Sequence, residues 1–480
     1  MSGAGFDLGG ALADARHRGA RWSPIVEDGR TTEVAVLDRE ADAVAAELAA
    51  KGVAAGARVG LRMRNTAPHL AAAFGVWRAG AVLVPLSPRL TEPEAEALLA
   101  HAAVAATLDV DGGSGARTIA VRARGSAAKA ETGSDALAAI AYTSGTTGRP
   151  KGVELTHANL LWAAAAVART RRDGERSVAA AMSPLCHVPV FVSHYLARLL
   201  TGGTVILGAF EAERVVRLVR EHGVTDLPLV PAMVEPLLDA DPSGAESLVK
   251  ITVGSAHTPM HVKQELAARF PRAEILEAYG QTETTDGLTM TIGREALERP
   301  GTVGRAHALV GVAVLSTESD VCAAGEPGEI AARGPTIMRG YLDDPERTAE
   351  ALRDGWLRTG DLGRLDEDGY LFITGRTKEL IISGGENVSP EDVERVLARH
   401  PAVVEVAVFG IPHARWGEQV AAAVVARADV SVDELREFAR GELAPFKLPR
   451  ELVVVARLPR TSAGKVQRAE LRKLYLSRSG

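Results

Sequence analysis

A run of small hydroxyl residues and glycines that ends on one lysine is the strongest chemical signal in the sequence. It reads Tyr-Thr-Ser-Gly-Thr-Thr-Gly-Arg-Pro-Lys-Gly from Tyr142 to Gly152 and follows an apolar segment that predicts a strand. Small residues let backbone N–H groups turn toward an anion, the hydroxyls add donors, and Lys151 adds positive charge. The run therefore predicts a phosphate-binding loop, with a solvated surface turn as the alternative.

The loop is not of the Walker A type, which needs a lysine directly after glycine at the start of a helix. Here Arg149 and Pro150 separate Gly148 from Lys151. Cys186 and His187 are adjacent, but neighbouring residues on a strand point to opposite faces, which disfavours a Cys–His nucleophile pair.

Seven further motifs follow in order, and with the loop they resemble the adenylate-forming superfamily of acyl-CoA synthetases, carrier-loading adenylation domains and luciferases. The resemblance covers nearly the whole chain. It departs from the family in the short 105–135 connection and at His257-Thr258, where many relatives carry Pro-Leu. The motifs are Pro184–His187, Gly254–Ala256, Tyr279–Glu283, Thr359–Asp361, Gly375–Lys378, Ser383–Pro390, and the pair 445–450 and 459–465.

The resemblance implies ATP- and Mg²⁺-dependent conversion of a carboxylic acid to an acyl-AMP, with pyrophosphate release, followed by transfer to coenzyme A. A carboxylate is a poor acyl donor until it is joined to AMP, and bringing two anions together requires charge compensation. The implied catalytic residues are Lys465, Thr282, Glu283 and His187, of which Glu283 is also the Mg²⁺ ligand.

The resemblance also implies which residues hold the nucleotide and coenzyme A. Asp361 accepts from the ribose hydroxyls, Arg376 supports the ribose-phosphate side, and Lys378 is the hinge. The implied cofactor-binding set is Thr143, Ser144, Gly145, Thr146, Thr147, Gly148, Lys151, Gly254, Ser255, Ala256, Tyr279, Gly280, Asp361, Arg376, Lys378, Gly384 and Gly385.

The acid pocket is implied to be lined by stretches 187–195, 254–260 and 277–288, with Phe191, Tyr195, His257 and Asp286 as its named residues. None of these stretches contains Lys or Arg, so a second carboxylate would be buried without a cation. We therefore expect an aryl, aryl-acrylic or medium-length apolar acid. Asp286 would favour an amino or hydroxyl substituent if it faces the pocket, and the alternative is that it points into solvent.

The acceptor is left open by the sequence. A stand-alone adenylation enzyme could pass the activated group to a carrier protein or to an amine; the chain has no carrier domain with an Asp-Ser-Leu attachment site, which favours free coenzyme A. A luciferase-like oxygenase is a further alternative. A catalytically silent acyl-nucleotide sensor would be expected to lack Lys465 or Glu283.

The composition excludes several other classes. Lys and Arg total 55 and Asp and Glu total 61, giving a net charge of −6 without the basic footprint of a nucleic-acid binder. Two cysteines, Cys186 and Cys322, cannot build a disulfide framework or a four-ligand zinc site. No signal peptide and no uninterrupted apolar run of roughly 18 residues is evident. We expect a soluble cytoplasmic protein without a membrane span, and a homodimer is the candidate assembly.

Hydrophobic periodicity predicts the elements that must position these motifs. Residues 35–104 alternate helix and strand, with a strand at 81–88 apolar enough to be buried on both faces of a parallel sheet. Thr91 is the expected N-cap of the next helix. The stretch 312–374 predicts short antiparallel strands, and residues after 379 predict a compact α+β unit.

The expected fold is a multidomain α/β protein. A large N-terminal domain, residues 1–376, would contain layered α/β sheets plus a β-barrel-like section. A small mobile α+β domain, residues 379–480, would follow a hinge near Lys378.

Overall fold

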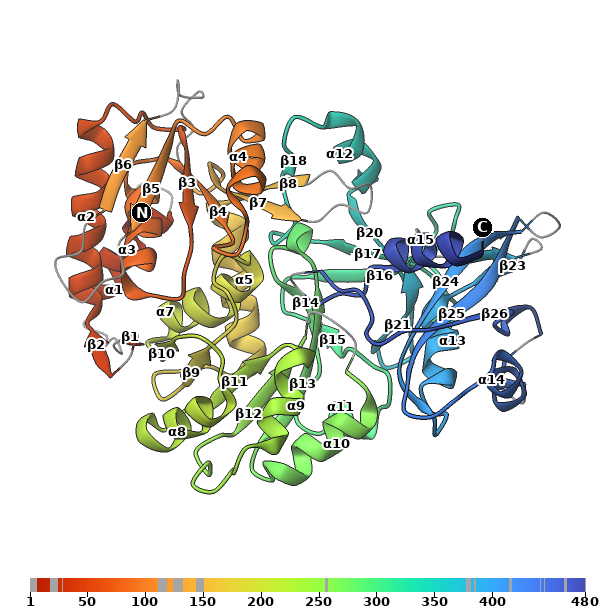
Figure 1. The fold of residues 1–480 in the computed structure, drawn as a ribbon. Coiled ribbons are helices and arrows are strands. Elements are labelled where there is room, and N and C mark those ends of the chain that lie inside the picture. The colour runs from red at the N-terminus through yellow and green to blue at the C-terminus, as the bar shows by residue number, and fades with distance from the viewer. Residues whose placement is uncertain are drawn as a thin grey trace. The chain divides into compact units, whose positions relative to one another are not determined.

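A computed structural model describes the chain at residues 7–17, 25–27, 29–110, 119–123, 133–143, 151–254, 258–376, 381–383, 386–413, 417–440, 442–443, 445–461 and 464–479. It contains two compact units (Figure 1). The first comprises Met1–Val312 and Ala332–Arg358, and the second comprises Ala313–Ala331 and Thr359–Gly480. Each unit is described by itself.

One sheet of the first unit carries the predicted phosphate loop. Its strand order is β18-β8-β7-β4-β3-β5-β6, with parallel pairing around β4 and β3 and antiparallel pairing at both edges. The central strand β4 is buried at every position, as its apolar sequence predicts. The strands are β18 (Gly340–Tyr341), β8 (Lys151–Thr156), β7 (Leu137–Thr143), β4 (Val82–Leu86), β3 (Arg58–Arg62), β5 (Ala106–Val110) and β6 (Ile119–Ala123).

Helices cover this sheet and fix β7 in place. The side chain of Trp77 on α3 donates a hydrogen bond to the Ala138 carbonyl of β7 over 2.8 Å. Thr91 caps α4 through a reciprocal capping box with Glu94, confirming the expected N-cap. The helices are α1 (Leu8–His17), α2 (Val34–Ala50), α3 (Ala67–Arg78), α4 (Glu92–His101) and α5 (His157–Arg171).

The second sheet of the first unit has a parallel centre. Its order is β15-β14-β13-β12-β11-β9-β10-β1-β2, and only the edge pairs involving β14, β15 and β2 are antiparallel. The strands are β1 (Ile25–Glu27), β2 (Arg30–Thr32), β9 (Val178–Ala181), β10 (Thr204–Leu207), β11 (Asp226–Leu229), β12 (Lys250–Val253), β13 (Glu274–Gly280), β14 (Gly287–Met290) and β15 (Arg305–Ala306).

The helices beside this sheet include one irregular segment. A π-helical turn, Phe191–Leu196, separates the short α6 (Val188–Val190) from α7 (Ala197–Thr201). Such turns are rare and re-aim side chains within a helix. The other helices are α8 (Ala212–His222), α9 (Pro231–Asp239), α10 (Met260–Arg269), α11 (Glu295–Glu298) and, after β18, α12 (Pro345–Ala351).

The segment expected to be barrel-like forms a five-stranded sheet. Strands β16 (Gly311–Leu315), β17 (Gly328–Arg333), β20 (Trp356–Leu365) and β19 (Leu352–Arg353) are neighbours in that order, and β21 (Leu371–Arg376) pairs with β20. The chain passes from one compact unit to the other within β16, β17 and β20. The predicted boundary near residue 376 was the position of a hinge. The boundary of the compact units is different: residues 313–331 and 359–376 belong to the same unit as the C-terminal residues, because strands β16, β17, β20 and β21 form one sheet.

The C-terminal α+β unit has its own core. Its sheet contains β22 (Ile381–Ser383), β23 (Glu386–Val388), β24 (Val403–His413), β25 (Gly417–Ala426) and β26 (Glu451–Val454). Helices α13 (Pro390–Leu397), α14 (Val432–Ala439) and α15 (Arg468–Ser479) complete it. No helix among the described residues is long and apolar enough to cross a membrane.

Candidate active site

An antiparallel hairpin brings the two ends of the phosphate loop together. The pairing of β7 with β8 sets Thr143 opposite Lys151 and Tyr142 opposite Gly152. Lys151 therefore begins a strand, not a helix, which confirms that the loop differs from a Walker A loop. A Cβ at Gly152 would lie 3.0 Å from Ile140 Cγ2, so a larger residue there would require the neighbouring side chains to shift.

Part of the predicted site lies outside the described residues. The flanking positions are defined: Thr143 and Lys151 frame the phosphate loop, Gly254 follows β12, and Ser383 pairs with Glu386. The predicted residues outside the described ranges are Ser144, Gly145, Thr146, Thr147, Gly148, Ser255, Ala256, His257, Lys378, Gly384 and Gly385.

A tight turn between β13 and β14 carries Thr282 and Glu283. The register of the two strands shifts between Tyr279 and Gly280, and a Cβ at Gly280 would lie only 2.3 Å from the Asp286 carbonyl oxygen. A side chain at this position is therefore excluded. Tyr279 is buried on β13, and Thr282 opens a single 3₁₀ turn.

The turn is held in an uncommon conformation. Thr285 has a φ of +68°, although it is not glycine, and β-branched residues rarely adopt such values. Its hydroxyl donates to the Thr336 carbonyl over 2.6 Å. Backbone strain of this kind persists where surrounding contacts fix it, commonly at functional sites.

Glu283, Tyr341 and Lys151 form a connected polar group within the first unit. The Tyr341 hydroxyl donates to Glu283 Oε1 over 2.9 Å. The Lys151 ammonium lies 5.0 Å from the centre of the Tyr341 ring, within the range of a cation–π contact. The structure thus brings together the predicted metal ligand and the predicted phosphate-loop cation through a tyrosine.

Tyr341 was not predicted as a site residue. It reaches this position because β18 pairs antiparallel with β8, which sets Tyr341 opposite Val153. Such a pairing joins segments far apart in the chain, and no local pattern in the sequence around Tyr341 indicates it.

The acidic group at Glu283 fits a magnesium ion and does not fit a protein-enclosed metal centre. Across the described ranges, no cluster of three or more His, Cys, Asp or Glu side chains could hold a metal. Mg²⁺ usually binds through one or two carboxylates together with substrate phosphates and water. A single buried carboxylate close to a phosphate-loop lysine meets that requirement.

Asp286 lies on the same turn in a different environment. It is buried, which excludes the solvent-facing alternative, and its Oδ2 has no hydrogen-bond partner. Burial raises the pKa of Asp286 to about 7, against the opposing effects of Arg171 and of the Gly287 N–H. The carboxyl therefore titrates near neutral pH.

A buried charge cluster lies near Asp286 and was not predicted. Arg171 of α5 bonds Asp173 over 2.8 Å, and Arg198 of α7 bonds both Asp173 and Asp226. The pocket stretches considered in the sequence contain no cation, but the structure adds Arg171 from a different helix. Because Arg171 is paired with Asp173, it does not supply an unpaired cation for a second substrate carboxylate.

His307 adds a neutral imidazole beside this part of the turn. Its Nε2 has no hydrogen-bond partner and would lie 3.0 Å from a Cβ at Gly287, while its Nδ1 is 2.8 Å from Thr170 Oγ1. Burial, followed by the charge of Arg171, lowers the pKa of His307 to about 4. Two buried polar atoms without partners thus flank Gly287.

His187 and Cys186 differ in exposure, although they lie in a turn and not on the strand that the prediction assumed. His187 is exposed at the start of α6, whereas Cys186 is buried. Burial raises the pKa of the Cys186 thiol to about 11, so it is not a thiolate at neutral pH. Both observations argue against a Cys–His nucleophile pair.

Phe191 and Tyr195 depart from the expectation that they line an acid pocket. Their rings pack on α3: Phe191 lies 5.6 Å from Trp77, and Tyr195 lies 5.9 Å from Phe74, between ring centres. The π-helical turn aims both rings into the core. The structure therefore gives these two side chains a packing role.

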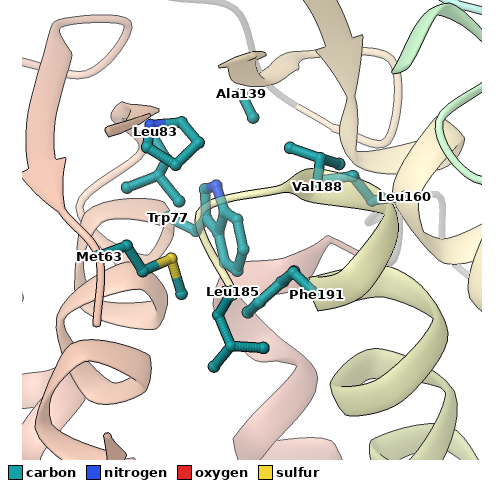
Figure 2. Close-up of a pocket in the computed structure, with 9 residues that line it drawn as sticks. Met63, Trp77, Leu83, Ala139, Leu160, Leu185, Val188 and Phe191 are labelled. Atoms are coloured by element: carbon teal, nitrogen blue, oxygen red, sulfur yellow. The ribbon is translucent and has the colours of Figure 1, made fainter. Parts of the chain in front are cut away.

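Figure 2 shows Phe191 and Trp77 facing one small cavity. Its volume is about 10 Å³, and a single water molecule needs at least roughly 10–15 Å³. The cavity is a packing void and is too small to accept an organic acid.

In the second unit, strand pairing brings the two predicted ribose-side residues together. Asp361 on β20 lies opposite Arg376 on β21 in the antiparallel register. Asp361 is buried, and its N–H donates to Thr359 Oγ1 over 3.1 Å. The threonine and aspartate of this motif therefore act as one local unit.

Lys465 lies on a short loop of the second unit. The Thr461 N–H donates to the Lys465 carbonyl over 2.8 Å, and the Lys465 N–H donates back to Thr461 Oγ1 over 3.2 Å. The lysine side chain is exposed. The loop is thus closed by two hydrogen bonds between Thr461 and Lys465.

Comparison with known proteins agrees with this geometry. The family model described as AMP-binding enzyme matches residues 13–342, and the one described as AMP-binding enzyme C-terminal domain matches residues 392–465. The chain belongs to the AMP-binding enzyme family. This confirms the resemblance to the adenylate-forming superfamily and the α/β fold with a small C-terminal domain.

The chain aligns with known members of this family over nearly its full length. It is 35% identical to a feruloyl-CoA synthase from Amycolatopsis sp, covering 95% of this chain and 98% of that protein. It is 34% identical to the long-chain-fatty-acid–CoA ligase FadD13 of Mycobacterium tuberculosis, covering 89% and 90%. ATP-bound MatB from Rhodopseudomonas palustris superposes with a TM-score of 0.87 at 30% identity, covering 98% and 99%.

These findings make this AMP-binding enzyme an AMP-forming acid–thiol ligase, as the sequence predicted. ATP, a small carboxylic acid and coenzyme A are its substrates. The roles of individual residues, the metal and the identity of the acid are addressed below as proposals.

Proposed function

We propose that this enzyme uses ATP and Mg²⁺ to activate an aryl or aryl-acrylic acid, or a medium-length apolar one, and transfers the acyl group to coenzyme A. The observation that supports the ATP-dependent first step is that Glu283 and Lys151 both contact Tyr341, next to the phosphate loop. The feruloyl-CoA synthase relative supports an aryl-acrylic acid, and the long-chain relative keeps the apolar acid as the second candidate.

In this proposal the phosphate groups of ATP bind at the loop framed by Thr143 and Lys151. The Lys151 ammonium neutralises phosphate charge, and Thr282 bonds the α-phosphate. Asp361 accepts from the ribose hydroxyls, with Arg376 beside it. Preorganised cations and N–H dipoles of this kind stabilise charge that develops as the acid carboxylate attacks the α-phosphate.

Glu283 would hold the Mg²⁺ ion. When bound, the ion neutralises phosphate oxygens and so favours the departure of pyrophosphate. Lys465 is proposed to lie between the acid carboxylate and the α-phosphate during adenylation. An ammonium group is a compact point charge and suits a position between two anions.

We propose that a polar ring substituent of the acid, at the end away from the reacting carboxylate, contacts Asp286 and His307. Each of these buried side chains has one polar atom without a partner, and an unmatched buried polar atom costs about 1–3 kcal/mol. A ring amino or hydroxyl group would supply a partner. Neither group is a free cation, so a short dicarboxylate such as malonate is disfavoured.

Coenzyme A is proposed as the acceptor over a carrier protein or an amine. An ATP–pyrophosphate exchange panel tests the first half-reaction with benzoate, cinnamate, their amino and hydroxy derivatives, octanoate and malonate. Thioester formation measured with and without coenzyme A tests the second. Malonate as the best substrate would contradict the pocket proposal, and AMP release that does not depend on coenzyme A would contradict the acceptor.

The variant Lys465→Ala separates the two steps. We expect it to abolish adenylation while largely sparing thioester formation from supplied acyl-AMP. Equal loss of both would contradict the assigned role. We further propose a cytoplasmic location, where ATP and coenzyme A are both available, and a homodimer, which sedimentation velocity would test.

A further inference from the structure

Residues 336–342 are bonded to the turn that carries Glu283. The Met338 N–H donates to the Glu283 carbonyl over 2.9 Å. The Thr285 hydroxyl donates to the Thr336 carbonyl over 2.6 Å. Two hydrogen bonds therefore hold the 336–342 segment against the turn, one at Glu283 and one at Thr285.

The same segment is bonded to the strand that follows the phosphate loop. Strand β18 pairs with β8, the Leu342 N–H donates to the Gly152 carbonyl over 2.8 Å, and the Arg339 N–H donates to the Glu154 carbonyl over 2.9 Å. The segment thus connects the strand that begins at Lys151 to the turn that carries the acidic residue.

A third attachment comes from the start of α5. The Asn159 side-chain amide donates to the carbonyls of Pro335 and Ile337 over 2.8 and 2.9 Å. Asn159 also completes the capping box with Thr156 that ends β8 and begins the helix. The backbone around Tyr341 is therefore attached to three parts of the first unit: the Glu283 turn, β8 and the start of α5.

The Tyr341 side chain makes two different contacts from this fixed position. Its hydroxyl donates to Glu283 Oε1 over 2.9 Å, and its ring faces the Lys151 ammonium at 5.0 Å.

We propose that Tyr341 is a positioning residue that sets the orientation of the metal ligand Glu283 with its hydroxyl and the position of the phosphate-loop cation Lys151 with its ring. This inference rests on the proposed roles of Glu283 and Lys151. Groups that orient a metal ligand from behind typically change metal affinity or activity by about 10–100-fold when removed. The hydroxyl and the ring act on different partners, so two substitutions separate them.

The test compares Tyr341→Phe, which keeps the ring, with Tyr341→Leu, which removes both groups. Tyr475→Phe on α15 is the matched control, since it makes the same chemical change at a residue to which no role in the site is assigned. Isothermal titration calorimetry measures binding of ATP with excess EDTA and with increasing Mg²⁺. The Mg²⁺ concentration for half-maximal ATP–pyrophosphate exchange is measured alongside.

For Tyr341→Phe we expect the half-saturating Mg²⁺ concentration to rise about tenfold, with ATP affinity in EDTA within about twofold of wild type because the cation–π contact remains. For Tyr341→Leu we expect the same Mg²⁺ effect plus about two- to fivefold weaker ATP binding in EDTA. Tyr475→Phe should change neither quantity.

An unchanged Mg²⁺ dependence in Tyr341→Phe would overturn the proposal. So would equal losses of ATP affinity with and without Mg²⁺ accompanied by a lower melting temperature, because that pattern indicates a structural role. The calorimetric readout does not require the acid to be known. If no acid supports exchange by the wild type, the proposed function fails while the role of Tyr341 is still decided.

Discussion

Glu283 and Asp286 lie on one short turn and are equally buried, with 8% of each residue exposed. Their surroundings differ: Glu283 accepts a hydrogen bond from Tyr341, whereas Asp286 Oδ2 has no partner. Burial alone therefore does not determine what a carboxyl group can do. The Tyr341 hydroxyl gives Glu283 a fixed donor, whereas burial raises the pKa of Asp286 against the weaker effects of Arg171 and the Gly287 N–H.

The largest effect is expected from removing the charge of Glu283. Glu283→Gln should lower the rate of ATP–pyrophosphate exchange on the order of a thousandfold, because an amide cannot replace a carboxylate as the Mg²⁺ ligand. Asp286→Asn should lower it far less with an unsubstituted acid. Exchange rates measured for both variants with the same acid make the comparison.

ATP affinity in EDTA controls for a general disturbance of the turn and should match the wild type in both variants. Similar rate losses for the two variants would show that the turn, and not the charge at Glu283, limits exchange.

A second prediction concerns pH and isolates Asp286. Its pKa of about 7 in the folded protein exceeds the model-peptide value of 3.8, so the folded state holds a proton that the unfolded state releases. Stability from this proton is fully present below pH 4 and is lost as pH rises toward 7. Asp286→Asn cannot titrate and should escape the loss.

The free energy of unfolding of Asp286→Asn minus that of wild type should therefore increase by roughly 2–3 kcal/mol between pH 5 and pH 8. Denaturant unfolding followed by tryptophan fluorescence at several pH values measures it. A difference that stays constant with pH would mean that Asp286 is already ionised at pH 5 in the folded protein.

The smallest expected effect tests the backbone that separates the two carboxylates. Thr285→Ala removes the bond to the Thr336 carbonyl and should lower the free energy of unfolding by about 1 kcal/mol. Thr285→Ser keeps the hydroxyl and should stay near the wild type. If alanine and serine behave alike in denaturant unfolding, the hydroxyl does not hold the turn.

The sequence predicted the parts of the site that lie within continuous motifs. Local strand and turn patterns determine three of these parts. They are the hairpin whose first strand ends at Thr143 and whose second strand begins at Lys151, the turn that carries Glu283, and the strand that carries Asp361. Their roles could be inferred because eight motifs occurred in the order expected for one family. The same local patterns gave the alternating helices and strands of residues 35–104.

The parts that escaped prediction depend on contacts between distant segments. Tyr341 reaches Glu283 through the pairing of β18 with β8, and Asp286 meets Arg171 from α5. The packing role of Phe191 was not predicted, because nothing in its own segment of the sequence indicates the π-helical turn that directs its ring into the core. The parallel pairing of β1 with β10 is likewise a contact between distant segments of the chain.

The interrupted order of the second unit has a consequence for synthesis of the chain. Most of strand β17 is made before the segment 332–358, which belongs to the first unit, and most of its partner β20 is made after that segment. Because a chain emerges from the ribosome N-terminus first, β17 can pair with the earlier strand β16 but must wait until residues 332–358 have been made before it can pair with β20. Thr359 bonds the Ile330 carbonyl, and Gly360 bonds Glu329, so the strand that carries Asp361 is completed by an earlier piece of chain. A fragment that starts at residue 359 would emerge without that piece and would leave this edge of the Asp361 strand open to other chains.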